Sequence, residues 1–319
     1  MRLLAALLFA AAAPAWGQTP AYPTKAVRIV VGFAPGGSTD ITARIVAQKL
    51  TDLWGQTVVV DNRPGASGMI AAELTAKAAP DGYTLLASPQ TSTAVAPSLY
   101  PKIAYDPLRD FAPITVVASS PQLLVVHPSL PAKSFKEFVA LAKSRPGQLS
   151  YGSGGIGSTP HLGGELLSST VGIKMVHVPY KGENPALADV IGGQLPLMFS
   201  NLPVALPYTR SGRLRGLAVT SLQRSPLAPE TPTVAESGLP GFETATWTGL
   251  YAPAALPREL VLRINGDVIR LLSSAEVKER LAAQGLDLVG NTPEQHAAYL
   301  KSETIKWAKV IKDAGVRVE

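Results

Sequence analysis

Apolar positions follow two alternating patterns along the first part of the chain. Residues 29–31 and 58–60 are continuous apolar runs, which are typical of strands buried on both faces, and the mainly apolar residues 83–87 predict a third strand. Residues 41–54 and 69–78 place their apolar side chains at helical spacing and predict amphipathic helices. Strands and helices therefore alternate as βαβαβ, so we expect a parallel sheet with right-handed crossovers.

The pattern changes near residues 111–126. Two short apolar strands are predicted at 114–118 and 123–126, and the Ser-Ser-Pro-Gln between them suits a chain that crosses between two lobes. A second α/β unit is expected to follow, and residues 242–250 are expected to cross back. The remaining strands and helices are predicted at 134–143, 149–151, 161–168, 175–178, 185–191, 197–199, 214–220, 257–272, 275–284 and 292–314.

Two of the predicted strands run into glycine-rich turns that lead into helices. The first turn is Phe-Ala-Pro-Gly-Gly-Ser-Thr-Asp at residues 33–40, and the second is Gly-Ser-Gly-Gly-Ile-Gly-Ser-Thr-Pro at 152–160. Glycine leaves the backbone accessible, and a helix N-terminus presents free N–H groups and partial positive charge. Each turn is therefore a candidate site for a carboxylate or phosphate, with an ordinary βα turn as the alternative. One turn in each predicted lobe suggests a ligand held from both sides.

The N-terminal segment has the pattern of an export signal. Arg2 precedes the apolar run 3–13, and Ala15-Trp-Gly17 supplies small residues for cleavage after Gly17. This run is too short for a membrane span, and no later run reaches about 18 apolar residues. We therefore expect residues 1–17 to be a cleavable secretory signal peptide and the mature protein to be soluble.

Length, cysteine content and charge narrow the class of protein. The 302 residues that remain after cleavage (319 minus 17) favour two domains. The chain contains no cysteine, so an exported protein of this kind suits a bacterial periplasm better than a small disulfide scaffold. The net charge of +6 is scattered rather than gathered in basic runs, which argues against a nucleic-acid partner and favours anionic ligands.

Little in the sequence indicates catalysis. The four histidines, at 127, 161, 177 and 296, lack metal-motif spacing, and neither a G-x-S-x-G turn nor a phosphate-loop lysine occurs. Of the four, His161 lies at the start of the second helix and is a candidate ligand contact. We expect no catalytic residue, no metal and no cofactor.

Many short motifs, in the same order along nearly the whole mature chain, resemble those of the substrate-binding proteins of tripartite tricarboxylate transporters, the Bug family of periplasmic solute receptors. They include the 33–40 turn, Val-Asp-Asn-Arg-Pro-Gly-Ala at 60–66, Lys-Ala-Ala-Pro-Asp-Gly-Tyr at 77–83 and Val-His-Val-Pro-Tyr-Lys-Gly at 176–182. Ser200 and Ala96 depart from the family's usual residues, which are Asp or Gly and Asn, respectively.

The resemblance implies an α/β, two-lobed, type II periplasmic-binding-protein fold. Two mixed, mainly parallel sheets flanked by helices would face each other across a cleft. The implied division places residues 18–120 and 246–319 in lobe 1 and residues 121–245 in lobe 2.

The resemblance also implies that both turns hold a carboxylate, largely through backbone N–H groups. Carried over by position, the expected ligand-binding residues, with wall residues and His161 included, are Phe33, Ala34, Gly37, Ser38, Thr39, Asp40, Ser153, Gly157, Ser158, Thr159, His161, Tyr180, Asn201 and Trp247.

The function implied is capture of a small mono-, di- or tricarboxylate in the periplasm. The expected partners are this acid and the membrane permease subunits of a tripartite tricarboxylate transporter, with a sensor protein as a further candidate. We expect a monomer. The alternative is a periplasmic enzyme or signalling subunit on the same scaffold, because a fold alone does not fix function.

Overall fold

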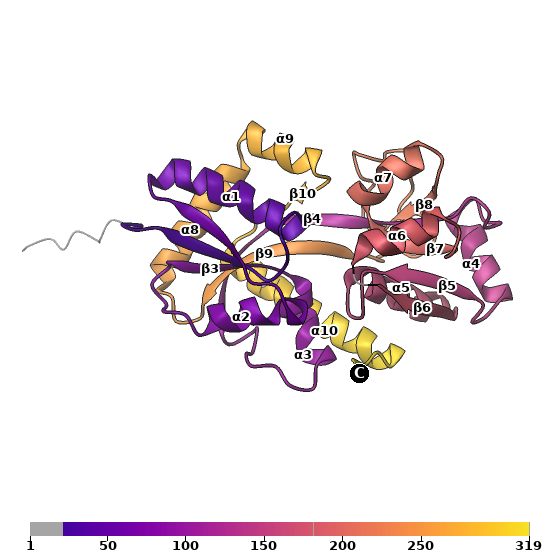
Figure 1. Cartoon of the computed structure of the whole chain (residues 1–319), viewed down its shortest axis with the longest axis horizontal. Coiled ribbons are helices and arrows are strands. Elements are labelled where there is room, and N and C mark those ends of the chain that lie inside the picture. Colours follow the sequence, from indigo (N-terminus) through magenta and orange to yellow (C-terminus); the bar gives the residue numbers. More distant parts are fainter. Residues whose placement is uncertain (1–21, 181, 319) are drawn as a thin grey trace, which may run out of the picture.

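The computed structural model describes residues 22–180 and 182–318, so the expected signal peptide lies outside the described residues. Within these two ranges, no helix combines the length and apolar character needed to cross a membrane. The chain forms two lobes joined by long strands (Figure 1). Below, the half built on the first three strands is called the first lobe, and the half built on strands β5 to β8 is called the second lobe.

The first lobe contains the predicted βαβαβ unit. Strand β1 (Val27–Val31) pairs in parallel with β2 (Val58–Asn62) and with β3 (Thr84–Pro89). Strand β9 (Ala245–Pro253) lies antiparallel to β3, and β4 (Phe111–Val126) lies antiparallel to β9. The parallel strands predicted from the apolar runs are thus confirmed, and the antiparallel pair β4 and β9 extends the sheet.

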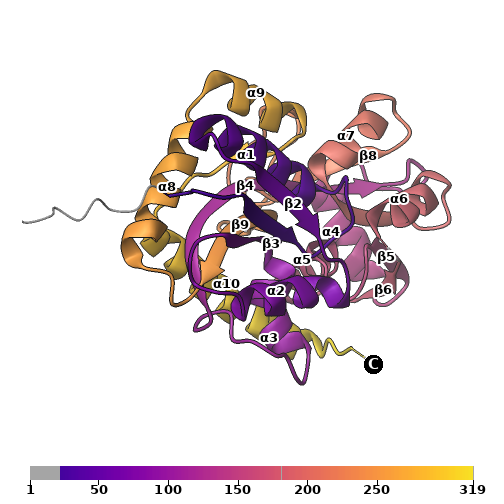
Figure 2. The same ribbon diagram turned by 60° about the vertical axis from the view of Figure 1, so that its left-hand side comes forward.

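Helices cover both faces of the sheet in the first lobe (Figure 2). One core joins the sheet to helices α1 (Ser38–Trp54), α8 (Arg258–Leu272) and α9 (Ala275–Ala283). The opposite core joins it to α2 (Met69–Ala76), α3 (Ala96–Leu99) and α10 (Pro293–Ala314). A 3-10 turn (Ala66–Gly68), a π-helical turn (Thr91–Val95) and strand β10 (Asp287–Leu288), none of which was predicted, complete this lobe.

The second lobe repeats this layered arrangement. Strand β5 (Leu149–Ser153) pairs in parallel with β6 (Met175–Pro179) and β7 (Leu197–Asn201), while β8 (Arg215–Val219) is antiparallel to β4. Helices α4 (Phe135–Ser144) and α5 (Thr159–Val171) pack on one face of the sheet. On the other face lie α6 (Glu183–Ile191) and α7 (Leu202–Arg210), the latter absent from the sequence prediction.

Strand β4 corrects one prediction. The two strands expected around residues 119–122 are a single strand, because Ser119 pairs with Trp247 and Pro121 with Ala245 in β9. The next residue, Gln122, pairs instead with Asn201 in β7. Proline lacks a backbone donor, and it stands where β4 changes its partner, so little pairing is lost. The predicted division of the lobes at residues 120/121 and 245/246 stays a prediction.

The lobes also touch along one side. Helix α10 contacts α5, and Leu162 of α5 belongs to the same apolar core as Leu99 and Trp307 of the first lobe. Figure 1 shows α10 extending from the first lobe below the second. The joint between the lobes therefore includes this apolar contact as well as the two crossing strands.

Candidate functional site

A cleft of about 690 Å³ lies between the two lobes. Both glycine turns contribute to its walls, as do the start of α6 and the crossing strands. Its lining residues are Phe33, Gly36, Gly37, Ser38, Thr39, Ile41, Pro89, Thr91, Ser120, Gly154, Ser158, Thr159, Pro160, Gly182, Glu183, Asn184, Asn201, Pro203, Val204, Thr246, Ala283, Gln284 and Leu286.

The first glycine turn is held in shape by Asp40. Its buried carboxylate accepts hydrogen bonds from the Gly36 N–H, Arg44 Nε and Asn62 Nδ2, each at 2.9 Å. Asn62 also donates to the Phe33 carbonyl at 3.0 Å. Burial alone would raise the pKa of Asp40, but these hydrogen bonds, that from Arg44 foremost, outweigh it and hold the pKa below its ordinary value. Asp40 is therefore ionised at neutral pH, and its hydrogen bonds hold the turn in its conformation.

The same turn leaves the start of α1 open to the cleft. Gly37 is the N-cap residue, and no side chain of the described residues caps this helix. The first N–H groups of an α-helix have no partner within the helix and carry partial positive charge. Because Gly37, Ser38 and Thr39 all line the cleft, those donors lie at its wall. This end of α1 can bind a carboxylate.

The second glycine turn uses its polar groups internally. Ser158 is the N-cap residue of α5, where its hydroxyl accepts a hydrogen bond from the His161 N–H and donates one to the Gly155 carbonyl. The Gly157 N–H donates to His161 Nδ1 at 3.0 Å. An added Cβ on Gly157 would lie 2.2 Å from Leu99 of the first lobe. This turn therefore packs against the other lobe, while the N–H groups of Gly155, Gly157 and Ser158 already have partners within the turn and the helix.

Two stacked imidazoles support the second turn from behind. The rings of His161 and His177 are parallel within 13°, with centroids 3.7 Å apart, and His177 Nε2 lies 2.6 Å from the Ser153 hydroxyl. Burial lowers the pKa of His161 to about 3, with a contribution from His177, and burial lowers the pKa of His177 to about 4. Both rings are neutral at pH 7, which leaves His161 Nδ1 free to accept from the turn.

Glu183 forms part of the second lobe's wall. Its carboxylate accepts hydrogen bonds from the Ser200 hydroxyl, the Asn201 N–H and Asn201 Nδ2, each at 2.6 Å. Thr246 of the crossing strand β9 donates to the Asn201 side-chain oxygen at 3.0 Å. Burial raises the pKa of Glu183, although these hydrogen bonds oppose the shift.

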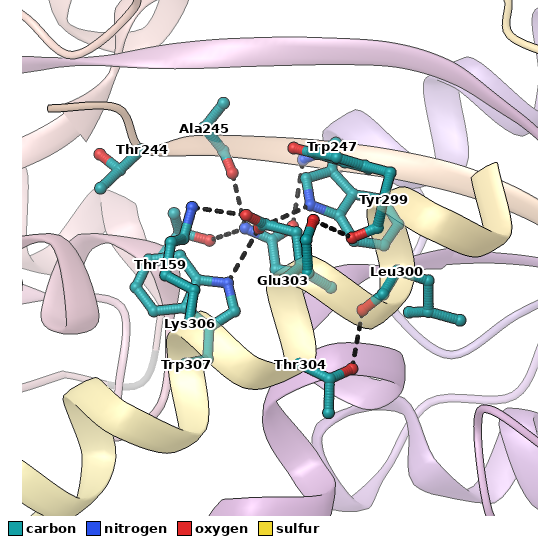
Figure 3. A network of polar contacts seen from close by, with 12 residues as sticks. Thr159, Thr244, Ala245, Trp247, Tyr299, Leu300, Glu303, Thr304, Lys306 and Trp307 are labelled. Carbon is teal, nitrogen blue, oxygen red and sulfur yellow. Dashed lines mark hydrogen bonds and ion pairs between the residues drawn. The ribbon is translucent and has the colours of Figure 1, made fainter. Parts of the chain in front are cut away.

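A buried glutamine links the lobes beside the cleft. Gln90 Nε2 donates to the Thr159 hydroxyl at 2.6 Å and to the Ala245 carbonyl at 2.7 Å, and Gln90 Oε1 accepts from the Trp247 N–H. Figure 3 shows how the Trp247 side chain continues the network: its indole, like that of Trp307, donates to the buried carboxylate of Glu303 on α10. The crossing strand β9 is thus tied to α10 and to both lobes.

The structure brings some of the predicted ligand-binding residues to the cleft and leaves others outside its lining. Those that line the cleft are Phe33, Gly37, Ser38, Thr39, Ser158, Thr159 and Asn201. Those that do not are Ala34, Asp40, Ser153, Gly157, His161, Tyr180 and Trp247. The Tyr180 hydroxyl donates to Asp189, and Trp247 is buried against α10.

Sequence reasoning missed Glu183, Thr246 and Gln90. The only local signal for Glu183 is an acidic residue directly after Gly182 at a helix start, which is also the ordinary place for a helix-stabilising carboxylate. The donors that surround it come from β7, whose proximity depends on the tertiary fold.

Known proteins resemble this chain over most of its length. Residues 42–316 match the family described as tripartite tricarboxylate transporter family receptor. Protein BugT of Bordetella pertussis is 39% identical over 309 residues, which cover 97% of this chain and 94% of BugT.

Two solved structures are similar in sequence and fold. Rpa4515 of R. palustris, solved with adipate, is 40% identical with a TM-score of 0.82, covering 93% of this chain and 99% of that one. MatC from Rhodopseudomonas palustris, solved with bound malate, is 34% identical with a TM-score of 0.76, covering 91% and 100%.

Proposed function

The chain belongs to the tripartite tricarboxylate transporter receptors, the periplasmic solute-binding proteins of the Bug family, and from this premise we propose that it captures a small organic acid between its two lobes and delivers it to a membrane permease. Export would use the signal peptide expected at residues 1–17. Two related structures contain adipate and malate, which supports a carboxylate as the ligand.

The observation that carries the proposal is the uncapped start of α1 in the wall of the cleft. In the proposed complex, the N–H groups of Gly37, Ser38 and Thr39 bind one carboxylate of the ligand. Hydrogen bonds to a charged group contribute about 1.5–3 kcal/mol each, so a few such donors suffice for useful affinity. Asp40 has a positioning role in this scheme, since its contacts fix the turn that presents these donors.

Closure of the lobes would complete the site. We propose that residues 18–120 with 246–319 move as one lobe and residues 121–245 as the other, with β4 and β9 as the hinge. A ligand shifts such an equilibrium only by its differential affinity for the open and closed forms. Thr159, Asn201 and Glu183 on the second lobe are placed to supply that difference.

The partners proposed for the loaded receptor are the permease subunits, with a sensor protein as a further candidate, and the receptor itself is proposed to act as a monomer. Uptake of labelled acid by cells with and without the receptor tests delivery. Light scattering of the purified protein tests the monomer, and a stable dimer would contradict it.

A thermal-shift screen of carboxylates, phosphates and sugars tests the ligand class directly. A carboxylate at one hundred times its Kd should add about 2.7 kcal/mol to the free energy of unfolding. Native mass spectrometry of protein purified without refolding should identify an acid that remains bound. Stabilisation by sugars alone, with no response to any carboxylate, would contradict the proposal.

A further inference from the structure

An acidic residue forms part of the cleft wall on the second lobe. Among the described residues that line the cleft, Glu183 alone carries an acidic or basic side chain. It is the first residue of α6 and is partly buried in the wall formed with Gly182 and Asn184. A carboxylate at a helix N-terminus is commonplace as a stabilising group, so its surroundings decide whether it does more.

The surroundings of Glu183 hold its side chain as an acceptor. The backbone N–H of Asn201 can only donate, and it points at one carboxylate oxygen at 2.6 Å. The Asn201 side chain donates from Nδ2 to the other carboxylate oxygen at 2.6 Å, and its oxygen accepts from the Thr246 hydroxyl. With the Ser200 hydroxyl, all three donors are therefore committed to Glu183 rather than to a ligand.

This arrangement differs from that at the start of α1. There, the Asp40 carboxylate holds the Gly36 N–H, but Gly37, Ser38 and Thr39 line the cleft at a helix start without a side-chain cap. On the second lobe, the corresponding donors already hold a carboxylate, so a ligand carboxylate at this wall would have to displace Glu183 and would meet a like charge. The wall instead offers acceptor oxygen to the ligand.

Among the described residues, the hydrogen-bond partners of Glu183 are all neutral. Burial raises the pKa of Glu183, whereas these hydrogen bonds favour its ionised form and oppose the shift. A buried anion is costly unless a cation or enough donors compensate it, and lobe closure would remove more water from around this one. A cationic group of the ligand is the natural compensation, because it would enter as the water leaves.

We propose that Glu183 determines the ligand class: the acid carries a hydrogen-bond donor, and specifically a protonated amine, at the end opposite its carboxylate. The carboxylate binds at the N-terminus of α1, and the amine pairs with Glu183 across the cleft. This inference rests on the proposed function, because it presumes a carboxylate at the first turn.

Isothermal titration with matched acids tests the proposal. The pairs are γ-aminobutyrate with succinate and ε-aminocaproate with adipate, and caproate serves as the acid without a second polar end. The wild-type protein should bind an aminocarboxylate roughly tenfold or more tighter than the dicarboxylate of equal length, as expected for a hydrogen bond between charged groups.

The Glu183→Gln variant should invert this order. Removing the charge weakens the aminocarboxylate by roughly tenfold or more and relieves the repulsion of the dicarboxylate. The control is Glu294→Gln, an exposed acid that pairs with Arg258 at the start of α10, and this variant should keep the wild-type order. The wild-type series stands even if Glu183→Gln does not fold.

Three results would overturn the assignment. The first is a wild-type protein that prefers the dicarboxylate at both lengths. The second is caproate binding as tightly as ε-aminocaproate, and the third is a Glu183→Gln variant that folds and keeps the wild-type order. A protein that binds none of these acids, and responds to no carboxylate in the thermal screen, contradicts the proposed function itself.

Discussion

The two glycine turns resemble each other in sequence and differ in what their donors do. In the first, Gly36 and Gly37 have open space where a Cβ would stand, and the helix that follows has no side-chain cap. In the second, Ser158 caps the helix and the Gly157 N–H is bound by His161. The first turn can receive an anion, whereas the second is occupied by its own lobe and by contact with the other.

This difference suggests that the two turns have different roles at the cleft. A turn with free N–H groups suits ligand capture, because these groups exchange water for ligand oxygen. In the second turn, the Gly157 N–H already has a partner and the glycine lies close to Leu99 of the first lobe. Such a contact helps to fix the position of one lobe against the other. Ser158 and Thr159 of the second turn also line the cleft, so the two-sided grip suggested by the sequence stays a prediction, to which the structure adds the wall around Glu183 and Asn201.

The largest expected difference between the two turns is their effect on the free energy of unfolding at acid pH. The pKa values of His161 and His177 are held near 3 and 4, below the ordinary 6.5, so the folded state binds fewer protons than the unfolded state. The stability they contribute is complete above pH 6.5 and is lost as the pH falls towards 4. At pH 5 the two rings together should lower the free energy of unfolding by about 4 kcal/mol. Asp40 of the first turn, with its lowered pKa, should contribute no loss in this range.

Urea unfolding between pH 7.5 and 5 measures this slope. Buried His296 acts in the same direction, so a variant is needed to isolate the turn. His161→Gln removes one titrating ring and should reduce the loss of unfolding free energy between pH 7.5 and 5 by about 2 kcal/mol. His127→Gln, at a surface turn with Ser129, is the control. An unchanged slope in His161→Gln would contradict this account of the second turn.

Valine at each turn should give the next largest contrast. Gly157→Val meets Leu99 and a φ of +77°, and overpacking together with backbone strain should cost about 2–5 kcal/mol of stability. Gly37→Val meets neither, because its φ is −79° and no atom lies within 4 Å of the new Cβ. Its free energy of unfolding should change by less than about 1 kcal/mol. Equal losses of unfolding free energy in the two variants would contradict the idea that the second turn packs between the lobes while the first is open to a ligand.

Gly37→Val, which should leave the free energy of unfolding almost unchanged, should weaken ligand binding. Valine at position 37 adds its side chain to the cleft wall beside the N–H groups of α1, so affinity for the tightest acid found in the screen should fall by about 1.5–3 kcal/mol. Calorimetry on the folded variant measures this loss. Wild-type affinity in Gly37→Val would exclude the first turn as the carboxylate site.

The sequence predicted the features that depend on neighbouring residues, namely the order of strands and helices and the positions of the glycine turns. Apolar runs and helical periodicity predicted the βαβαβ order. The two glycine turns were predicted to face a ligand from opposite lobes, and residues of both turns line the cleft. Periodicity did not reveal that β4 is continuous, because the pairing that carries Ser119 and Pro121 comes from β9.

Side-chain orientation was the part that sequence could not supply. Asp40 was expected to contact the ligand. Instead, the Asp40 carboxylate accepts a hydrogen bond from Asn62, which lies on β2, and it is held within the turn. Glu183 was overlooked because its donors arrive from β7, and no local pattern announces such a long-range partner. Local chemistry thus indicated where the site lies, and the tertiary contacts determined which groups face a ligand.

The smallest expected contrast concerns the two serines. Ser158→Ala removes an N-cap hydroxyl that also donates to the Gly155 carbonyl at 2.7 Å, so it should lower the free energy of unfolding by about 1 kcal/mol. Ser38→Ala removes a hydroxyl that follows the N-cap and is not a capping group, and its effect should stay within about 0.5 kcal/mol.

Paired urea titrations at pH 7.5 resolve this difference, and the same proteins test binding. Backbone N–H groups survive both substitutions, so neither variant should lose more than about tenfold in affinity for the acid found in the screen. A Ser38→Ala variant that no longer binds would mean that the hydroxyl, rather than the backbone of α1, holds the carboxylate. In that case the openness of the first turn would reflect a side-chain site, and its contrast with the capped second turn would need another explanation.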